Sequence, residues 1–245
     1  QGMTEGEQVT SQPYVRSATG KVGQVDARAV PRYAGIATFA RLPQRHEVED
    51  HDIAVVGVPF DSGVTYLVFS DYERPAFRLA AMMGLPCLFA FTHDSIGIGR
   101  NGPTHQPVEY LAGLRAIPNL LVFRPADAVE AAECWELAIA NRTGPSCLVF
   151  ARQPQEAVRR EAGANRCAQG AYVLAEAKGT RAATILATGT EVALAMQART
   201  LLAAEGIDVA VVSMPCWALF EQQPRAARAA VLGTAPRVGV EAAVR

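Results

Sequence analysis

Short apolar runs alternate with stretches of helical periodicity along most of this chain, and this alternation restricts the fold more than any other feature. Residues 53–58 are rich in β-branched side chains, and residues 85–91 form a second apolar run of strand length. Between them, residues 75–83 have the pattern of a helix that ends at Gly84. Strands that alternate with helices form parallel sheets with helices on both faces. We therefore expect an α/β fold built on an open parallel sheet.

The alternation continues in two further groups of elements. Asp127 is suited to cap a helix over residues 127–140, because Glu130 follows it three positions later, as in a capping box. In the helix predicted over residues 190–205, Leu194 and Leu201 fall on the predicted apolar face. The remaining predicted elements are helices over residues 107–117 and 190–205, and strands over residues 120–123, 147–150, 184–187, 207–213 and 238–240.

These patterns divide the chain into four segments. Residues 1–50 are polar and mixed in composition, and we expect a partly disordered N-terminal extension. Residues 51–152 carry the first α/β pattern. Residues 153–181 contain few apolar runs, which predicts a linker. Residues 182–245 begin a second α/β unit, which we expect to be truncated.

The richest polar segment is the 92–105 loop, T-H-D-S-I-G-I-G-R-N-G-P-T-H. It follows a predicted strand and precedes a predicted helix. Loops at this position in open α/β sheets carry ligand sites. The alternative is an ordinary connection whose glycines serve its turns.

The 92–105 loop resembles the substrate loop of transketolases, the thiamine-diphosphate transferases of the pentose phosphate pathway that move two-carbon ketol units between sugar phosphates. The resemblance covers roughly residues 66–245. It implies a partial pyrimidine-type domain over residues 51–152 and a truncated C-terminal domain over residues 182–245. The matching blocks are residues 106–109 (QPVE), 115–120 (RAIPNL), 124–127 (RPAD), 148–153 (LVFARQ), 187–192 (ATGTEV) and 212–215 (VSMP).

The resemblance implies roles for four side chains. His93 corresponds to a histidine that contacts the substrate phosphate, and His105 to one that hydrogen-bonds the sugar hydroxyls and carbonyl oxygen; both are the predicted catalytic residues. Arg152 corresponds to an arginine that binds the phosphate. Asn101 stands where transketolases usually carry an aspartate that reads a sugar hydroxyl, and an amide brings no charge. The alternatives are a structural hydrogen bond for His93, a helix cap for His105 and a surface salt bridge for Arg152.

Three aromatic residues precede the first predicted helix. Tyr66, Phe69 and Tyr72 are spaced three residues apart, which places them on one helical face. By resemblance they enclose the aminopyrimidine ring of thiamine diphosphate, on which flat rings can stack. The alternative is core packing.

The N-terminal quarter resembles a different family. Residues 30–39 and 52–64 are similar to the start of an agmatinase-type ureohydrolase, a manganese enzyme that cleaves guanidino groups. The two resemblances meet near Thr65 and Tyr66, which suggests a chimera of two partial genes. The Asp-x-His-x-Asp metal ligands of ureohydrolases have no counterpart, and the acidic run over residues 46–52 reads as a solvated loop. We therefore expect no metal site in the chain itself.

Two groups needed for ketol transfer are missing from the sequence. The glutamate that activates the cofactor falls in the replaced segment, and no Gly-Asp-Gly motif for the diphosphate and Mg²⁺ occurs. We expect the isolated chain to be inactive, although the family implies thiamine diphosphate, Mg²⁺, sugar phosphate substrates and a homodimer. The alternatives are an agmatinase-like ureohydrolase and a non-catalytic fusion fragment.

Composition narrows the setting of the protein. A net charge of -1 gives no sign of a nucleic-acid or membrane partner. No apolar run approaches the length of a membrane span. The cysteines form no C-x-x-C pair and lie mostly in apolar runs, which favours free thiols and a cytoplasmic location. They are Cys87, Cys134, Cys147, Cys167 and Cys216.

Overall fold

The computed structural model describes residues 14–16, 22–25, 55–56, 73–94, 108–161 and 163–243. The chain divides into two units, residues 1–57 and residues 58–245. In the first unit, β1 (Tyr14–Arg16) pairs antiparallel with β2 (Val22–Val25). The first unit also contains β3 (Val55–Val56), which lies inside the strand predicted over residues 53–58. The remaining description concerns the second unit.

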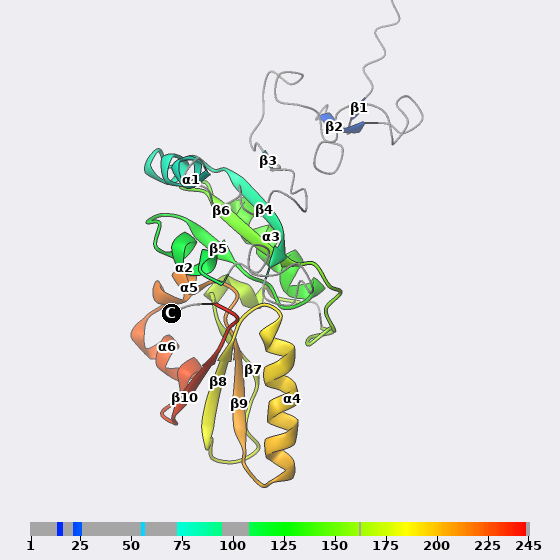
Figure 1. The fold of residues 1–245 in the computed structure, drawn as a ribbon, viewed down its shortest axis with the longest axis vertical. Helices are drawn as coiled ribbons and strands as arrows, with labels where there is room; N and C mark the ends of the chain where they lie inside the picture. The colour runs from blue at the N-terminus through cyan, green and yellow to red at the C-terminus, as the bar shows by residue number, and fades with distance from the viewer. Residues whose placement is uncertain are drawn as a thin grey trace, which may run out of the picture. The chain divides into compact units, whose positions relative to one another are not determined.

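The second unit contains two domains. The first domain consists of a parallel sheet and the helices that pack on it (Figure 1). Its strands β4 (Leu88–Asp94), β6 (Ser146–Ala151) and β5 (Leu121–Phe123) lie side by side in this order, and all are parallel. Helices α1 (Glu73–Met82) and α2 (Tyr110–Arg115) pack on one face. Helix α3 (Ala128–Ala140) packs on the other, which confirms the predicted layered α/β architecture.

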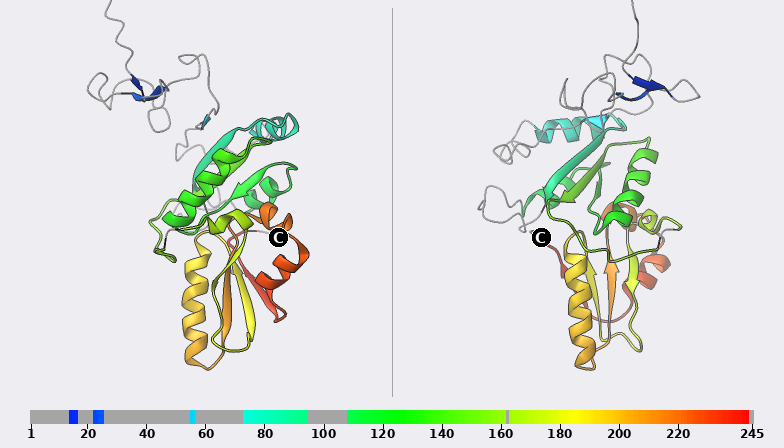
Figure 2. Two further views of the ribbon diagram at one scale, coloured as in Figure 1. Left: turned by 180° about the vertical axis from the view of Figure 1, so that it is seen from behind. Right: turned by 90° about the vertical axis from the view of Figure 1, so that its right-hand side faces the viewer.

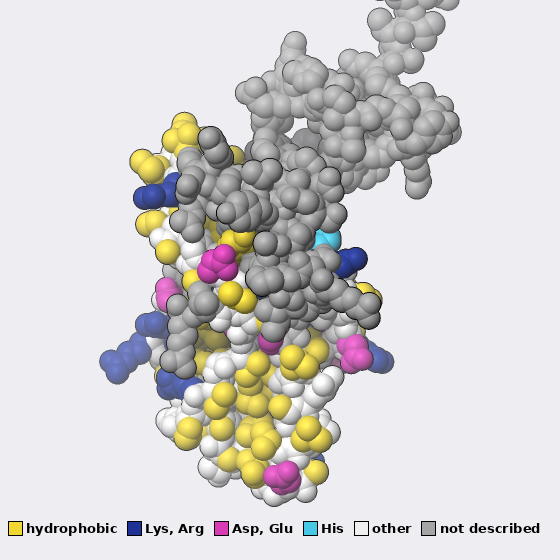
Figure 3. All heavy atoms as spheres, in the orientation of Figure 1, with side chains coloured by type: hydrophobic (Ala, Val, Ile, Leu, Met, Phe, Trp, Pro, Cys, Tyr) yellow, Lys and Arg dark blue, Asp and Glu magenta, His cyan; other side chains and the backbone are white. Residues whose placement is uncertain are grey.

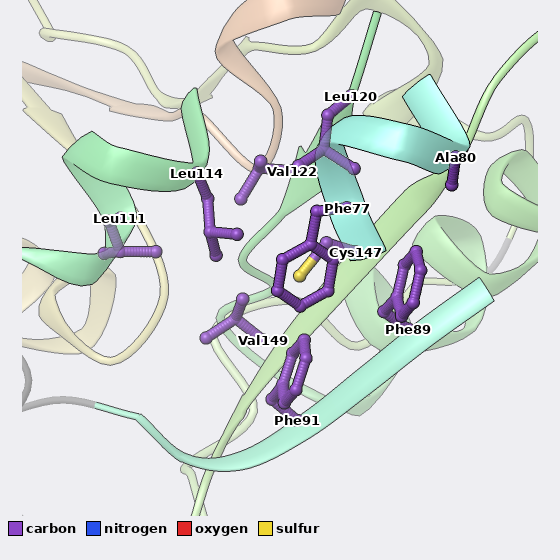
Figure 4. Close-up of a cluster of buried hydrophobic side chains, with 10 residues drawn as sticks. All are labelled: Phe77, Ala80, Phe89, Phe91, Leu111, Leu114, Leu120, Val122, Cys147 and Val149. Carbon is purple, nitrogen blue, oxygen red and sulfur yellow. The ribbon is translucent and has the colours of Figure 1, made fainter. Parts of the chain in front are cut away.

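The core between α1, α2 and the sheet is built around Phe77 of α1 (Figure 4). Its ring meets Phe89 and Phe91 of β4 edge-on, with centroids 4.6 Å and 5.7 Å apart. Phe89 and Phe91 are two residues apart, so both point to the same face of the strand. On the opposite face, Trp135 of α3 stacks on Phe150 at the end of β6. Both faces of the sheet are therefore covered.

The second domain is a mixed sheet of four described strands in the order β10-β8-β9-β7. Strands β8 (Ala183–Ala187), β9 (Val209–Ser213) and β10 (Arg237–Val240) are parallel, and β7 (Tyr172–Ala175) is antiparallel to β9. Figure 2 shows α4 (Glu191–Ala204) on one face of this sheet. The other face carries α5 (Trp217–Glu221) and α6 (Arg225–Leu232).

The segment between the two sheets differs from the predicted linker over residues 153–181. It contains a 3-10 helix, η5 (Arg166–Gln169), and the strand β7. Its short strand lies at the edge of the sheet, where a four-residue apolar run is enough for pairing and leaves little periodic signal. Helices α5 and α6 were likewise absent from the prediction.

Helix α4 buries a different set of side chains than the apolar pattern indicates. Leu194 and Leu201 of α4 are 55% and 70% exposed, whereas Val192 and Ala195 face the sheet. Small side chains allow the backbone of α4 to lie close to the strands, and the longer leucines remain at the surface. In α3, the predicted cap is confirmed, because the Glu130 backbone N–H donates to the Asp127 side chain.

Four of the five cysteines are buried and Cys87 is partly buried, and all five are free thiols, as the sequence predicts. Burial raises the pKa of the Cys216 thiol to about 12, and desolvation also raises the pKa of Cys147. These thiols remain protonated and pack as small apolar groups.

Candidate functional site

The carboxyl end of β4 departs from regular pairing at the position of a predicted site residue. Phe91 pairs with Val149 of β6, but the next pair joins Asp94 to Ala151, so β4 contains one extra residue. His93 lies within this bulge and has a φ of 68°. The left-handed region is uncommon for residues other than glycine, and bulges redirect side chains next to functional sites. The bulge therefore sets the direction in which His93 leaves the strand.

The strand also extends further than its hydrophobic pattern indicates. The apolar run predicts a strand over residues 85–91, whereas β4 runs from Leu88 to Asp94 and includes His93. The His93 side chain is half-buried, and its Nδ1 lies 2.8 Å from the Thr92 hydroxyl. This contact orients the imidazole ring.

Arg152 directly follows β6, the strand next to β4. The pairing of Asp94 with Ala151 brings the ends of the two strands to the same height. His93 and Arg152 therefore lie at one carboxyl edge of a parallel sheet, the edge where such sheets bind ligands. Arg152 is exposed.

The other predicted site residues lie outside the described residues. This applies to the sugar-contacting residues Asn101 and His105 and to the aromatic residues Tyr66, Phe69 and Tyr72. Their roles therefore stay predictions.

Beneath this edge lies a buried ion-pair network that the sequence analysis did not assign to any role. Arg124 directly follows β5, and its side chain is 1% exposed. Its Nε donates to Asp94 Oδ2 over 2.7 Å, and its Nη1 donates to a carboxylate oxygen of Glu191 at the start of α4. The same Nη1 donates to the Thr188 carbonyl oxygen over 2.6 Å. The guanidinium thus joins the first domain to the second.

Burial and the neighbouring charges shift the pKa values of Asp94 and Arg124. Burial raises the pKa of the Asp94 carboxyl, and the Arg124 guanidinium opposes this rise only in part. Burial lowers the pKa of Arg124, but the carboxylates of Asp94 and Glu191 raise it by more, so the net direction is upward. Arg124 therefore stays charged between two acidic groups. The sequence contains no signal for its burial, because a charged residue directly after an apolar strand is usually exposed.

A second buried network holds the domains together through α3. Glu130 is fully buried and accepts hydrogen bonds from the Tyr172 hydroxyl at 2.7 Å and the Ser213 hydroxyl at 2.6 Å. The Ala126 backbone N–H also donates to it, over 2.7 Å. Tyr172 lies in β7 and Ser213 in β9, so one carboxylate of the first domain anchors two strands of the second.

A cavity of about 850 Å³ lies in the second domain, at the carboxyl end of β8 beside α5, α6 and β10. Its walls include Leu186, Met214 and Phe220, with Arg228 and Arg237 among the charged residues. Neither His93 nor Arg152 lines it. We base the candidate site on the β4 and β6 edge, because the chemically suited side chains lie there.

Within the described residues, no three His, Cys, Asp or Glu side chains are grouped in a way that could hold a metal ion. The helices of the same residues include none with the length and apolarity to cross a membrane.

Comparison with known proteins identifies both domains. Residues 58–156 match the family model described as "Transketolase, pyrimidine binding domain", and residues 170–245 match "Transketolase-like TK C-terminal domain". The first match begins several residues before the predicted join near Thr65. The transketolase of Sinorhizobium medicae is 58% identical over 79% of this chain and 28% of its own length. The chain spans about a third or less of the length of this relative and of the transketolase of Cereibacter sphaeroides, which is 57% identical over 84% of this chain.

Solved structures give the same result. A transketolase from Pichia stipitis in complex with sedoheptulose-7-phosphate has a TM-score of 0.69 and 35% identity, covering 78% of this chain and 27% of that one. A structure described as "Split gene transketolase, inactive beta4 tetramer" has a TM-score of 0.58 and 26% identity, covering 71% of this chain and 55% of that one. These comparisons give no support to the agmatinase-type alternative for the chain.

Proposed function

We propose, from the premise that this chain belongs to the transketolase family, that its two domains form the part of a transketolase that binds the sugar phosphate. The observation that carries the proposal is the placement of His93 and Arg152 at one carboxyl edge of adjacent parallel strands. The activity to which this part contributes is the transfer of a two-carbon ketol unit between sugar phosphates. The relative from Pichia stipitis that was solved with sedoheptulose-7-phosphate supports this choice of ligand class.

The two side chains suit a phosphate group. A guanidinium can donate two parallel hydrogen bonds to phosphate oxygens, and an imidazole adds a donor at neutral pH. The contact between Thr92 and Nδ1 fixes the ring of His93, and we assign Nε2 as its donor to phosphate. The bulge sets this orientation before the ligand arrives, which reduces the ordering cost of binding.

We extend the proposal to the remaining residues of the family pattern. His105 hydrogen-bonds the sugar hydroxyls and carbonyl oxygen, and Asn101 contacts a hydroxyl without adding charge. Tyr66, Phe69 and Tyr72 enclose the pyrimidine ring of thiamine diphosphate. When bound, this cofactor would supply the nucleophilic carbon for ketol transfer, and the three aromatic residues would hold its pyrimidine ring.

The described residues do not fit the diphosphate and its metal ion. They offer no group of three metal-binding side chains, and the 245-residue sequence contains no Gly-Asp-Gly motif. The role proposed for this chain is therefore binding and orientation of the sugar phosphate. The solved structure described as "Split gene transketolase, inactive beta4 tetramer" supports the expectation that such a part alone is inactive.

We also propose that two copies of the chain associate. The end of α1 and the residues after it expose Leu79, Met82 and Met83, which are 56%, 82% and 59% exposed. Figure 3 shows hydrophobic side chains gathered over this helix. Contiguous exposed apolar groups mark interaction surfaces. Sedimentation of the chain with Met82→Lys would give a lower mass than the wild type, whereas unchanged mass would exclude this surface.

Phosphate binding can be tested on the purified chain. Inorganic phosphate and ribose 5-phosphate are titrated by calorimetry into the wild type and into the variants His93→Gln and Arg152→Gln. Each variant lacks one charge-assisted or polar contact with the phosphate group, and we expect its affinity for both ligands to fall about tenfold. The matched control is Arg142→Gln, because Arg142 is exposed and precedes β6, at the opposite edge of the sheet. Equal effects of Arg152→Gln and Arg142→Gln would contradict the proposed site.

A further inference from the structure

Asp94 directly follows His93 and is the last residue of β4. A contact that fixes the Asp94 side chain therefore also restrains the bulge. The Asp94 side chain is 5% exposed, and its Oδ2 accepts the hydrogen bond from Arg124 Nε. A residue in the left-handed region persists only when its surroundings impose that conformation. The buried ion pair of Asp94, directly after His93, is a contact that can do so.

The second domain is shaped around the same guanidinium. Gly189 has a φ of 57°, and a Cβ atom at this position would meet Arg124 Cζ at 2.7 Å. The Gly189 N–H donates to the Arg124 carbonyl oxygen over 3.1 Å, and the Thr188 hydroxyl donates to the same oxygen over 3.3 Å. The loop after β8 therefore contacts both the backbone and the side chain of Arg124.

Glu191 extends the network to the end of the second sheet. Besides Arg124, its Oε2 accepts a hydrogen bond from the backbone N–H of Ala242 over 3.1 Å. Ala242 follows β10, so this carboxylate connects the loop after β8, the segment after β10 and the first domain. A change in the second domain can therefore reach Asp94 through one guanidinium.

We infer that Arg124 is a positioning residue. Through Asp94 it holds His93 in the orientation that binds phosphate, and through Glu191 it makes that binding depend on the second domain. The inference deepens the proposed function and rests on it. Arg124 itself is buried beneath the edge and does not contact the ligand in this scheme.

The test compares variants on both sides of the network. Arg124→Lys keeps a positive charge but removes the guanidinium fork, and Glu191→Gln keeps the shape of the side chain but removes its charge. We expect each to weaken phosphate binding about tenfold, within the usual range of coupling between sites. The matched control is Glu133→Gln, which breaks another buried ion pair, with Arg159; the Glu133 carboxylate also accepts from the backbone N–H groups of Arg166 and Cys167.

A spectroscopic measurement separates positioning from simple loss of stability. The imidazole nitrogen resonances of His93 are recorded without ligand and assigned by their absence in His93→Gln. We expect Glu191→Gln and Arg124→Lys to shift them, and Glu133→Gln to leave them in place. If both network variants remain folded and show wild-type resonances and phosphate affinity, the inference is wrong. If His93→Gln binds phosphate as the wild type does, the proposed function fails, while the shift of the His93 resonances still decides the coupling.

Discussion

The buried carboxylate of Glu130 gives a sharp test of how the two domains are held together. The change Tyr172→Phe removes one of its three hydrogen-bond donors and little else. The ring of Tyr172 lies against the guanidinium groups of Arg159 and Arg166, at 5.3 Å and 4.2 Å, and a phenylalanine ring preserves these contacts.

The cost of this change depends on the charge of Glu130. Burial raises the pKa of Glu130, and the hydrogen bonds from Ser213 and Tyr172 offset this only in part. The folded pKa thus lies above the unfolded one, so the stabilising contribution of this group is greatest below the unfolded pKa and falls as the pH rises towards the folded pKa. Loss of the hydroxyl raises the folded pKa further. We expect the cost of Tyr172→Phe to rise with pH, from about 1 kcal/mol where Glu130 is protonated to about 2–3 kcal/mol where it is ionised.

The assay is urea unfolding across a series of pH values, followed by tryptophan fluorescence. The control repeats the substitution in a Glu130→Gln background, where no charge remains and the cost should be smaller and independent of pH. A cost of Tyr172→Phe that does not rise across the pH series, or that is unchanged in the Glu130→Gln background, would refute the reasoning.

Two further predictions concern single residues of the fold, and a third concerns activity. Phe77→Ala should lower the free energy of unfolding by about 3–5 kcal/mol, because it empties the centre of an aromatic cluster, and urea denaturation measures this. Gly189→Ala should destabilise by at least about 1 kcal/mol more than Gly206→Ala; both glycines have positive φ, but only Gly189 is crowded by Arg124. The 245-residue chain with excess thiamine diphosphate and Mg²⁺ should not turn over xylulose 5-phosphate and ribose 5-phosphate, and turnover that disappears in His105→Ala would contradict this.

The sequence predicts well those features of this fold that depend on contacts between residues close together in the chain. The cap of α3 is an example, because Asp127 and Glu130 are three residues apart and the cap bond joins those two residues. The second half of the capping box differs, since the Glu130 side chain accepts from Ala126 and turns into the core. That choice depends on Tyr172 and Ser213, which are 42 and 83 residues away and belong to another domain. Propensity and periodicity carry no information over such separations.

The candidate site shows the same division between local and non-local causes. A polar residue after an apolar run is enough to place His93 near a strand end, and Arg152 is placed by the same reasoning. The bulge that gives His93 its left-handed conformation arises from pairing with β6, more than 50 residues later. The contact that we expect to hold this conformation joins Asp94 to Arg124, 30 residues away, and Arg124 to Glu191, 67 residues away. The type of side chain at a binding edge can therefore be predicted from the sequence, but its orientation is set by the packing of two domains. For this reason, variants of Glu191 should alter His93, although the two residues are far apart in the sequence.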